Sequence, residues 1–346
     1  MNKNEIRAYF GTNINVRPDR LWYQHGTGAL GRMPGHVKTA AARLLAAGTR
    51  PETYKCTPHN RTLEEMDALL QSIRKGYSDA SGDRVQVAID RNGHVIVTNG
   101  AHRTACAIAL GLDAIPAHIV YRDAGWLKLK KALLDLNKSP RLYQWIDHPD
   151  FQLWGGRRRD TQLRADIIDR WLAQHAHAAM RGVDVGCNAG VLSCALARAG
   201  REMIGLDTNP HAVAAGNALA GMADVGAVFD GASRAHFAKC APIPIVAGAH
   251  REGADFIVCL SLLNHHQADH RSEEGQRIFA SFVDAAPIVF LDCPAPGDTV
   301  GGDTAFVEPE AVFEWCRASG ADGAGTVVAE RDKGGLMRTM LVWRTQ

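Results

Sequence analysis

The sequence predicts an α/β protein in two domains. The C-terminal domain is expected to be a doubly wound, mostly parallel sheet that ends in an antiparallel hairpin, and a smaller α+β domain precedes it. Three observations support this prediction. The chain has 346 residues, more than the ~100–150 residues of a common domain. From Thr161 onward, short apolar strands alternate with helices, as in βα units. Before that point a hairpin is followed by a helix and another strand, which is a different order.

The composition excludes a membrane protein. Hydrophobic residues make up 46% of the chain and charged residues 22%, and no apolar run approaches the ~20 residues that span a bilayer. The first residues, Met1 to Glu5, are not followed by the apolar core of a secretory signal. We therefore expect a cytoplasmic protein. The sequence gives no indication of its oligomeric state.

The net charge bears on the class of partner, and the cysteine spacing on the redox state of the thiols. The formal net charge is +2, so there is no general attraction to a polyanion, and nucleic acid is not favoured as a partner. The eight cysteines include no pair at C-x-x-C spacing. We expect them to be reduced and mostly buried.

The expected elements define three regions. Residues 1–123 form the smaller domain, 124–160 a linker helix and an irregular aromatic segment over the second domain, and 161–346 the larger domain. In the smaller domain we expect a helix over 63–73, strands over 85–89 and 95–97 joined at Asn92-Gly93, a helix over 104–110 and a strand over 117–120. In the larger domain we expect helices over 161–175, 192–199, 210–219, 276–285 and 311–318, strands over 182–185, 202–206, 225–229, 256–260 and 288–291, and hairpin strands over 326–330 and 338–343.

A glycine-containing turn follows the first strand of the larger domain. It begins after Asp184 and contains Gly186, Cys187, Asn188 and Gly190. Glycines let a ligand approach the backbone closely, but the spacing is not the full G-x-G-x-x-G of dinucleotide sites. The carboxylate of Asp184 would repel a pyrophosphate, whereas it suits the ammonium and sulfonium groups of S-adenosylmethionine (AdoMet). We predict that this loop binds AdoMet.

Further acids follow the next strands. Asp207, with Thr208 after it, ends the strand Met203 to Leu206, where a carboxylate can accept hydrogen bonds from both ribose hydroxyls. Asp230 follows the strand expected over 225–229, and it is either a contact of the adenine amino group or a turn residue. The predicted cofactor site therefore draws on several strand ends.

These residues resemble a known family. The run from Arg181 to Pro210, with Asp184, the glycine loop and Asp207, is similar to motif I and the following acidic strand of class I AdoMet-dependent methyltransferases. The resemblance covers roughly the last 180 residues. It implies a Rossmann-like fold with an antiparallel end. It also implies that the strand ending in Leu260 and Ser261 borders the transferred methyl group, so both are assigned to the cofactor site.

Two histidines follow that strand. His265 and His266 stand where a general base would remove the proton of a methyl acceptor, and the unperturbed histidine pKa of ~6.5 suits this task at neutral pH. The alternative is that one of the pair is structural. No acidic or cysteine partner completes a metal site with these histidines, so no metal is predicted.

In the smaller domain, Asn99, Gly100, His102 and Arg103 lie between a strand and a helix. A helix N-terminus and a guanidinium both attract phosphate, so we predict that these residues bind a phosphate or another part of the substrate. The run from 85 to 120, with Gly100 to Arg103, resembles the ParB and sulfiredoxin-like superfamily. This resemblance implies a nucleotide at the domain. Ala101 stands where sulfiredoxins carry their reactive cysteine, so sulfiredoxin chemistry is not expected, and no helix-turn-helix follows, so ParB-like DNA binding is only weakly supported.

The preferred hypothesis is an enzyme that transfers a methyl group from AdoMet to an oxygen of a small-molecule, saccharide or phosphorylated acceptor, which the N-terminal domain binds or modifies. Two alternatives remain. In one, the N-terminal domain docks DNA or RNA for nucleic-acid methylation. In the other, the chain is a bifunctional kinase and methyltransferase.

Overall fold

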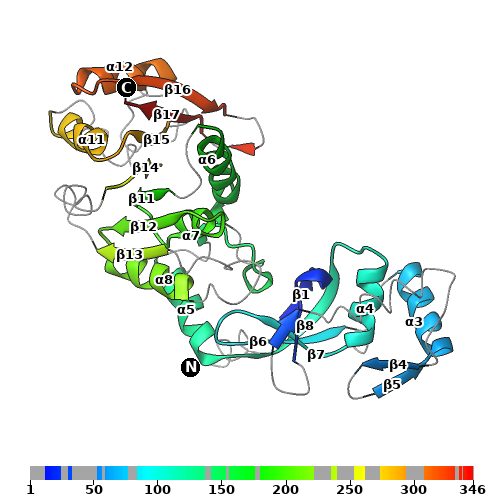
Figure 1. Cartoon of the computed structure of the whole chain (residues 1–346). Helices are drawn as coiled ribbons and strands as arrows, with labels where there is room; N and C mark the ends of the chain where they lie inside the picture. Colours follow the sequence, from blue (N-terminus) through cyan, green and yellow to red (C-terminus); the bar gives the residue numbers. More distant parts are fainter. Residues whose placement is uncertain are drawn as a thin grey trace. The chain divides into compact units, whose positions relative to one another are not determined.

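The structure is a computed structural model of the whole chain. It describes residues 12–24, 30–32, 53–56, 59–76, 84–136, 142–152, 156–175, 180–221, 235–239, 253–261, 273–293, 308–331, 335–336 and 338–345. The chain divides into two units, each with its own sheet (Figure 1). The first comprises residues up to Lys130 together with Asp147–Leu153. The second comprises Lys131–Ile146 and most of the chain from Trp154 onward.

The second unit is built on a sheet to which the described residues contribute seven strands. Their order is β13-β12-β11-β14-β15-β17-β16. The first five are parallel, and β17 runs antiparallel to both of its neighbours. The strands are β11 (Arg181–Val185), β12 (Glu202–Asp207), β13 (Ala235–Lys239), β14 (Phe256–Cys259), β15 (Ile288–Asp292), β16 (Ala324–Ala329) and β17 (Met340–Arg344). Because the order reverses at β11, the carboxyl ends of β11, β12 and β14 border the crevice where such sheets bind ligands.

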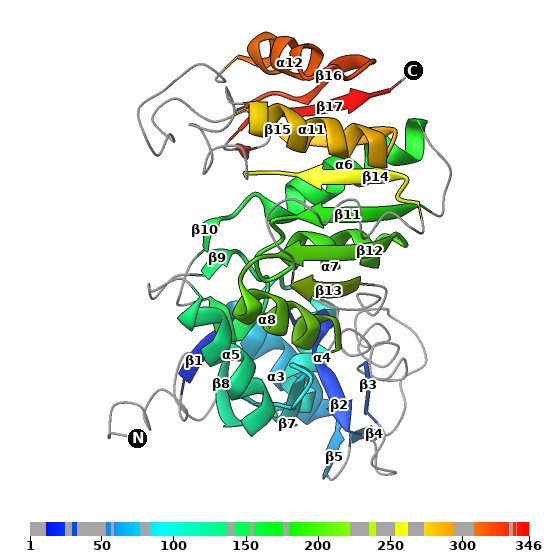
Figure 2. The same ribbon diagram turned by 90° about the vertical axis from the view of Figure 1, so that its left-hand side faces the viewer.

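Helices lie on both faces of this sheet. Figures 1 and 2 show α11 on one face and α6 on the other. Strand alternation explains the division: Val289 and Leu291 join the cluster under α11 and α12, whereas Phe290 between them meets Trp171 of α6, with ring centroids 5.4 Å apart. The helices are α6 (Thr161–His175), α7 (Val191–Arg198), α8 (Pro210–Gly221), α11 (Glu273–Ala285) and α12 (Pro309–Ala318).

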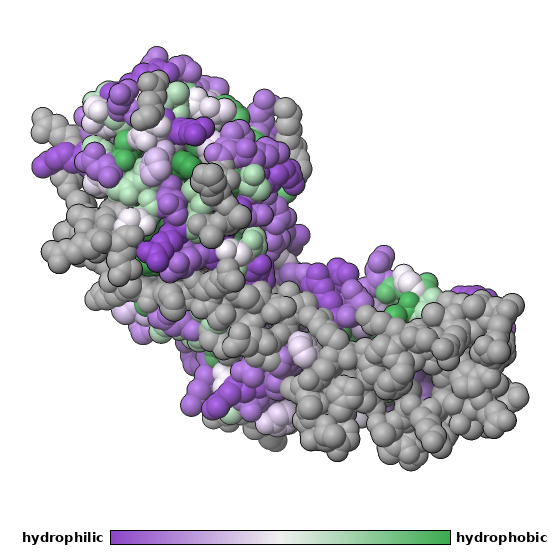
Figure 3. Space-filling view, in the orientation of Figure 1, coloured by the Kyte–Doolittle hydropathy of each residue, from purple (hydrophilic) through white to green (hydrophobic). Residues whose placement is uncertain are grey.

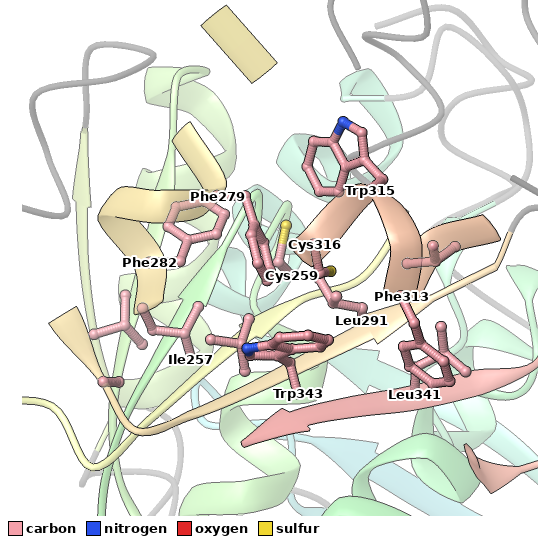
Figure 4. Close-up of a cluster of buried hydrophobic side chains, with 14 of the residues drawn as sticks. Ile257, Cys259, Phe279, Phe282, Leu291, Phe313, Trp315, Cys316, Leu341 and Trp343 are labelled. Atoms are coloured by element: carbon pink, nitrogen blue, oxygen red, sulfur yellow. The ribbon is translucent and has the colours of Figure 1, made fainter. Parts of the chain in front are cut away.

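The core under α11 and α12 is aromatic. Phe279 of α11 packs against Trp315 of α12 and Trp343 of β17, with ring centroids 5.2 and 6.2 Å away (Figure 4). Trp343 is fully buried. Burial of several such rings at ~25 cal/mol per Å² of apolar surface stabilises the end of the sheet that carries the antiparallel strand.

The first unit holds a second, mixed sheet in the order β1-β8-β6-β7-β2-β3. Strands β6 and β7 form the antiparallel hairpin, and β8 runs parallel to β6 after the crossover helix α4. Helices α3 and α4 pack together through Met66, Leu70, Ile73 and Cys106. The elements are β1 (Thr12–Val16), β2 (Trp22–Gln24), β3 (Leu30–Arg32), β4 (Thr53–Cys56), β5 (His59–Thr62), α3 (Leu63–Lys75), β6 (Val85–Ile89), β7 (Val95–Asn99), α4 (Ala101–Ala109), β8 (Ile115–Arg122) and α5 (Ala124–Asp135).

The segment after α5 contains β9 (Leu142–Gln144), a short 3₁₀ turn (Pro149–Phe151) and β10 (Gly156–Arg158), and β9 and β10 pair in parallel. Within the first unit, the turn is anchored by Asp150. Its carboxylate is buried and accepts hydrogen bonds from Arg122 at 2.7 Å and Trp126 at 2.8 Å, and Lys130 lies 3.0 Å from it. The segment that the sequence predicts as irregular therefore holds ordered structure.

Most predicted elements are confirmed, but the sequence predicts too few strands in the smaller domain. Strands β1 to β5 were not expected, because these runs of three to five residues are polar and lack a clear alternation. In the larger domain, the strand expected over 225–229 lies outside the described residues. The position beside β12 is taken by β13, at 235–239.

The described surface is polar. In the face shown in Figure 3, hydrophobic side chains are scattered among hydrophilic ones on the second unit. Of the large hydrophobic side chains in the described residues, Tyr121 and Val327 are exposed. None of the described helices combines the length and the apolar character needed to cross a bilayer.

Candidate functional site

The loop between β11 and α7 has a left-handed backbone at three positions. The φ angles are 74° at Gly186, 54° at Asn188 and 72° at Gly190. Glycine adopts such angles without strain, and asparagine is among the few other residues that tolerate them. The side-chain oxygen of Asn188 also accepts the N–H of Ala189 at 2.8 Å. Asn188 thus serves in place of a glycine within the loop.

The backbone N–H groups of this loop all have acceptors inside the chain. The two at the start bond to the carbonyl of Leu206 on β12, at 2.8 and 3.0 Å. Each of the next four N–H groups also has one acceptor. The N–H of Asn188 donates to the carboxylate of Asp207, and that of Ala189 to the side chain of Asn188. The N–H of Gly190 donates to the carbonyl of Cys187, and that of Val191 to the side chain of Gln144. The loop is therefore held by its own polar groups and presents no N–H between Gly186 and Val191 that lacks an acceptor.

Asp207 joins the loop to the end of β12. One carboxylate oxygen accepts the N–H of Asn188 and the other the N–H of Asn209, both at 2.8 Å. The side chain is half-buried, and each oxygen keeps a second lone pair. Thr208, next in the chain, is exposed. The structure thus brings together the loop and Asp207, as the sequence predicts.

Asp184 lies deeper than the sequence suggests. Its side chain is buried, and the hydroxyl of Ser193 on α7 donates to one carboxylate oxygen at 2.6 Å. Burial, partly opposed by this hydrogen bond, raises the pKa of Asp184 to about 7. No sequence pattern identifies Ser193, because the contact depends on how α7 returns over β11.

The raised pKa of Asp184 predicts a pH dependence of stability. Because the folded-state pKa is about 7 and the unfolded value ~4, the folded state binds more protons between these limits. The contribution of Asp184 to stability is therefore complete below pH ~4 and falls as the pH rises to ~7. Asp184→Asn should remove this component. Denaturant unfolding at several pH values should then show a smaller loss of stability between pH ~5 and ~8 for the variant. Equal slopes would contradict the assignment.

Leu260 and Ser261 follow β14, beside β11 in the sheet. Ser261 has φ 62° although it is not glycine, and Asp292 at the end of β15 holds it there. The Ser261 N–H donates to Asp292 at 2.8 Å, and the hydroxyl lies 3.3 Å from the other carboxylate oxygen. Strained backbone of this kind is maintained only where the surroundings impose it.

Asp292 itself is the centre of a buried ionic network. Arg164 of α6 and Arg338, which precedes β17, each donate to its carboxylate at 3.1 Å, and Asp160 accepts from Arg164 at 2.7 Å. All four side chains are buried. Although burial by itself would raise the pKa of Asp292, Arg164 and Arg338 bring it below its usual value. The charged partners on both sides hold Asp292 as a buried anion.

Three predicted site residues lie outside the described part of the chain: His265, His266 and Asp230. Strand β13, at 235–239, lies beside β12. The strand expected before Asp230 also lies outside the described residues, so the assignment of Asp230 stays a prediction.

In the first unit, Asn99 ends β7 and Gly100 is the N-cap of α4 with φ 95°. His102 and Arg103 occupy the first turn of that helix, which begins three residues earlier than predicted. A guanidinium nitrogen of Arg103 donates to the carbonyl of Arg84 at 3.2 Å. The structure thus gathers these residues at a helix N-terminus, and phosphate binding there stays a prediction.

Within the described residues, no three histidine, cysteine, aspartate or glutamate side chains are arranged to hold a metal ion. The cysteines that are free and buried are Cys106, Cys187, Cys194, Cys259, Cys293 and Cys316.

No known family model matches the chain. It is 31% identical over 139 residues to the ribosomal protein L11 methyltransferase of Dechloromonas aromatica (strain RCB), an alignment that covers 35% of this chain and 46% of that protein. The chain thus spans about half the length of the curated relative it matches.

Two solved structures give weaker matches. The bifunctional kinase-methyltransferase WbdD matches with a TM-score of 0.47 and 21% identity, over 62% of this chain and 46% of that one. Magnesium protoporphyrin IX methyltransferase (ChlM) from Synechocystis PCC 6803, solved with bound SAM, has a TM-score of 0.39 and 18% identity. The match covers 54% of this chain and 79% of that one. The parallel sheet with its antiparallel end, read from the structure itself, is the α/β fold that the class I methyltransferase resemblance implies.

Proposed function

We propose that the second unit binds AdoMet where β11 and β12 end and transfers its methyl group to an acceptor. The observation that carries this proposal is the arrangement of Asp207 on the loop. Its carboxylate is held by the N–H groups of Asn188 and Asn209, with lone pairs left for two ribose hydroxyls. The loop beside it is exposed at Gly186, where no side chain hinders the close approach of a ligand.

The hydrogen bonds of the loop favour AdoMet over a dinucleotide. A dinucleotide site offers free N–H groups at a helix N-terminus to the pyrophosphate. Here the N–H groups from Gly186 to Val191 already have acceptors, and the carboxylate of Asp207 contributes negative potential. A ligand with a sulfonium and no phosphate fits these groups better. The sequence relationship to a ribosomal protein methyltransferase supports the same cofactor.

When bound, AdoMet supplies a methyl group activated for in-line displacement. The residues of the chain then have to position the acceptor and accept its proton. We propose His265 or His266 as the base, because both follow β14, the strand beside β11. The proposed acceptor is an oxygen of a small molecule, a saccharide or a phosphorylated compound, and residues 99–103 of the first unit are proposed to bind it.

Calorimetry on the whole chain tests the cofactor. We expect binding of S-adenosylhomocysteine (AdoHcy) and none of NAD, and binding of NAD in place of AdoHcy would refute the proposal. Incubation with methyl-labelled AdoMet and cell extract tests the acceptor. Label should enter the small-molecule fraction, and the double variant His265→Ala/His266→Ala should lose this transfer while keeping AdoHcy affinity. Label in nucleic acid would overturn the proposed acceptor class.

A further inference from the structure

Gln144 lies outside the glycine loop in sequence but contacts it in the structure. Its side-chain oxygen accepts the N–H of Val191, the first residue of α7, at 3.2 Å. Since Val191 contributes a donor, the amide must present its oxygen and not its NH₂ group. The other acceptors of the loop N–H groups lie within the loop or at the end of β12. Gln144 alone among these acceptors comes from a separate segment that precedes β11.

The position of Gln144 is fixed by the backbone around it. It ends β9, where it pairs in register with Arg158 of β10, and the N–H of Trp145 donates to the Arg158 carbonyl at 2.9 Å. Strand β10 leads directly into α6, which the ion pair of Arg164 with Asp292 holds against the sheet. Gln144 is therefore preorganised over the start of α7 and does not depend on a bound ligand for its placement.

The contact changes what the helix can bind. The first N–H groups of a helix carry partial positive charge and attract phosphates. The N–H of Val191 already donates to the side-chain oxygen of Gln144, which is a neutral acceptor. An anion would have to displace this oxygen before it could bind there. The same oxygen adds negative potential beside the loop, which favours a cationic ligand.

We propose that Gln144 is a specificity-determining residue that occupies the first N–H of α7 in place of a phosphate, so that the site selects AdoMet over phosphate-bearing nucleotides. This inference rests on the proposed function and deepens it. It assigns the discrimination to one side chain, supplied by the segment in front of the sheet.

The test is calorimetric titration of the full chain with AdoHcy at rising inorganic phosphate and constant ionic strength. The unaltered chain should show no response to phosphate. In Gln144→Ala the freed N–H of Val191 should let phosphate compete, so that AdoHcy affinity falls by about fivefold as phosphate is raised. Gln144→Met, which keeps the length of the side chain without the oxygen, should behave in the same way.

Two control variants separate this role from a general loss of structure. Gln144→Glu retains an oxygen acceptor and adds a charge that repels phosphate, so its AdoHcy affinity should stay independent of phosphate. Gln162→Ala removes another glutamine, on α6, which donates to Asp166 and accepts from Arg198 at the opposite end of α7, and it should match the unaltered chain. The proposal is overturned if Gln144→Ala and Gln144→Met respond to phosphate no more than the unaltered chain, or if neither folds.

Failure of the proposed function would be seen separately. If the unaltered chain does not bind AdoHcy at all, the cofactor assignment is wrong. The role of Gln144 would then be read from direct titration with ADP-ribose, which Gln144→Ala should bind and the unaltered chain should not. Equal binding of ADP-ribose by both would reject the role of Gln144 as well.

Discussion

Asp207→Ala is expected to weaken AdoHcy binding by about 100-fold, equivalent to about 2.7 kcal/mol. Two losses add up in this variant. The ribose hydroxyls lose a charged acceptor, where each hydrogen bond contributes about 1.5–3 kcal/mol. The N–H of Asn188 also loses its partner at 2.8 Å, so the loop has to be ordered again when the ligand binds. Calorimetric titration of the purified variant measures the change.

Two further variants sharpen this prediction. Asp207→Asn keeps one oxygen but turns an NH₂ group toward a backbone donor, so a loss of about tenfold is expected. Glu202→Gln changes an exposed carboxylate at the opposite end of the same strand, β12, and should leave affinity unchanged. Wild-type affinity in Asp207→Ala would exclude Asp207 from the cofactor site.

Asp292→Ala is expected to lower the free energy of unfolding of the second unit by about 3–5 kcal/mol, the usual cost of removing one partner from a buried ion pair. The carboxylate is fully buried, and Arg164 and Arg338 both donate to it. Its removal takes one buried carboxylate partner away from both guanidinium groups. In a unit of this size the melting temperature should fall by about 10 °C, which differential scanning calorimetry would detect.

A surface pair provides the control for Asp292. Arg317 and Glu310 are 3.2 Å apart on α12, with both side chains more than half exposed, and exposed pairs of this kind contribute little. Arg317→Ala should therefore leave the melting temperature unchanged. If Asp292→Ala has the same melting temperature as the unaltered chain, the network at the ends of α6, β14, β15 and β17 does not stabilise the fold as proposed.

Local patterns predicted the second unit well. The alternation of strand and helix from Thr161 onward and the hairpin at the end both appear in the structure within a few residues of the expected bounds. The loop and Asp207 could be paired in advance because consecutive parallel strands place their carboxyl ends at one edge. The strands at 12–16 and 22–24 were missed because they pair with the distant strands β8 and β7. The strand at 30–32, which pairs with 22–24, was missed because its residues carry little pattern.

The amino-acid sequence by itself therefore determined the fold class, the glycine-containing loop and the neighbouring acid Asp207, because each depends on residues close together in the chain. Only the tertiary structure decided that Asp184 is turned inward to Ser193, that Asp292 is bound between Arg164 and Arg338, and that Gln144 covers the N–H of Val191. Of these contacts, those of Gln144 and Asp292 join residues 46 to 128 positions apart. A hydrogen bond or ion pair requires angstrom-scale placement of both partners, and no local pattern of hydrophobic and polar residues encodes that placement.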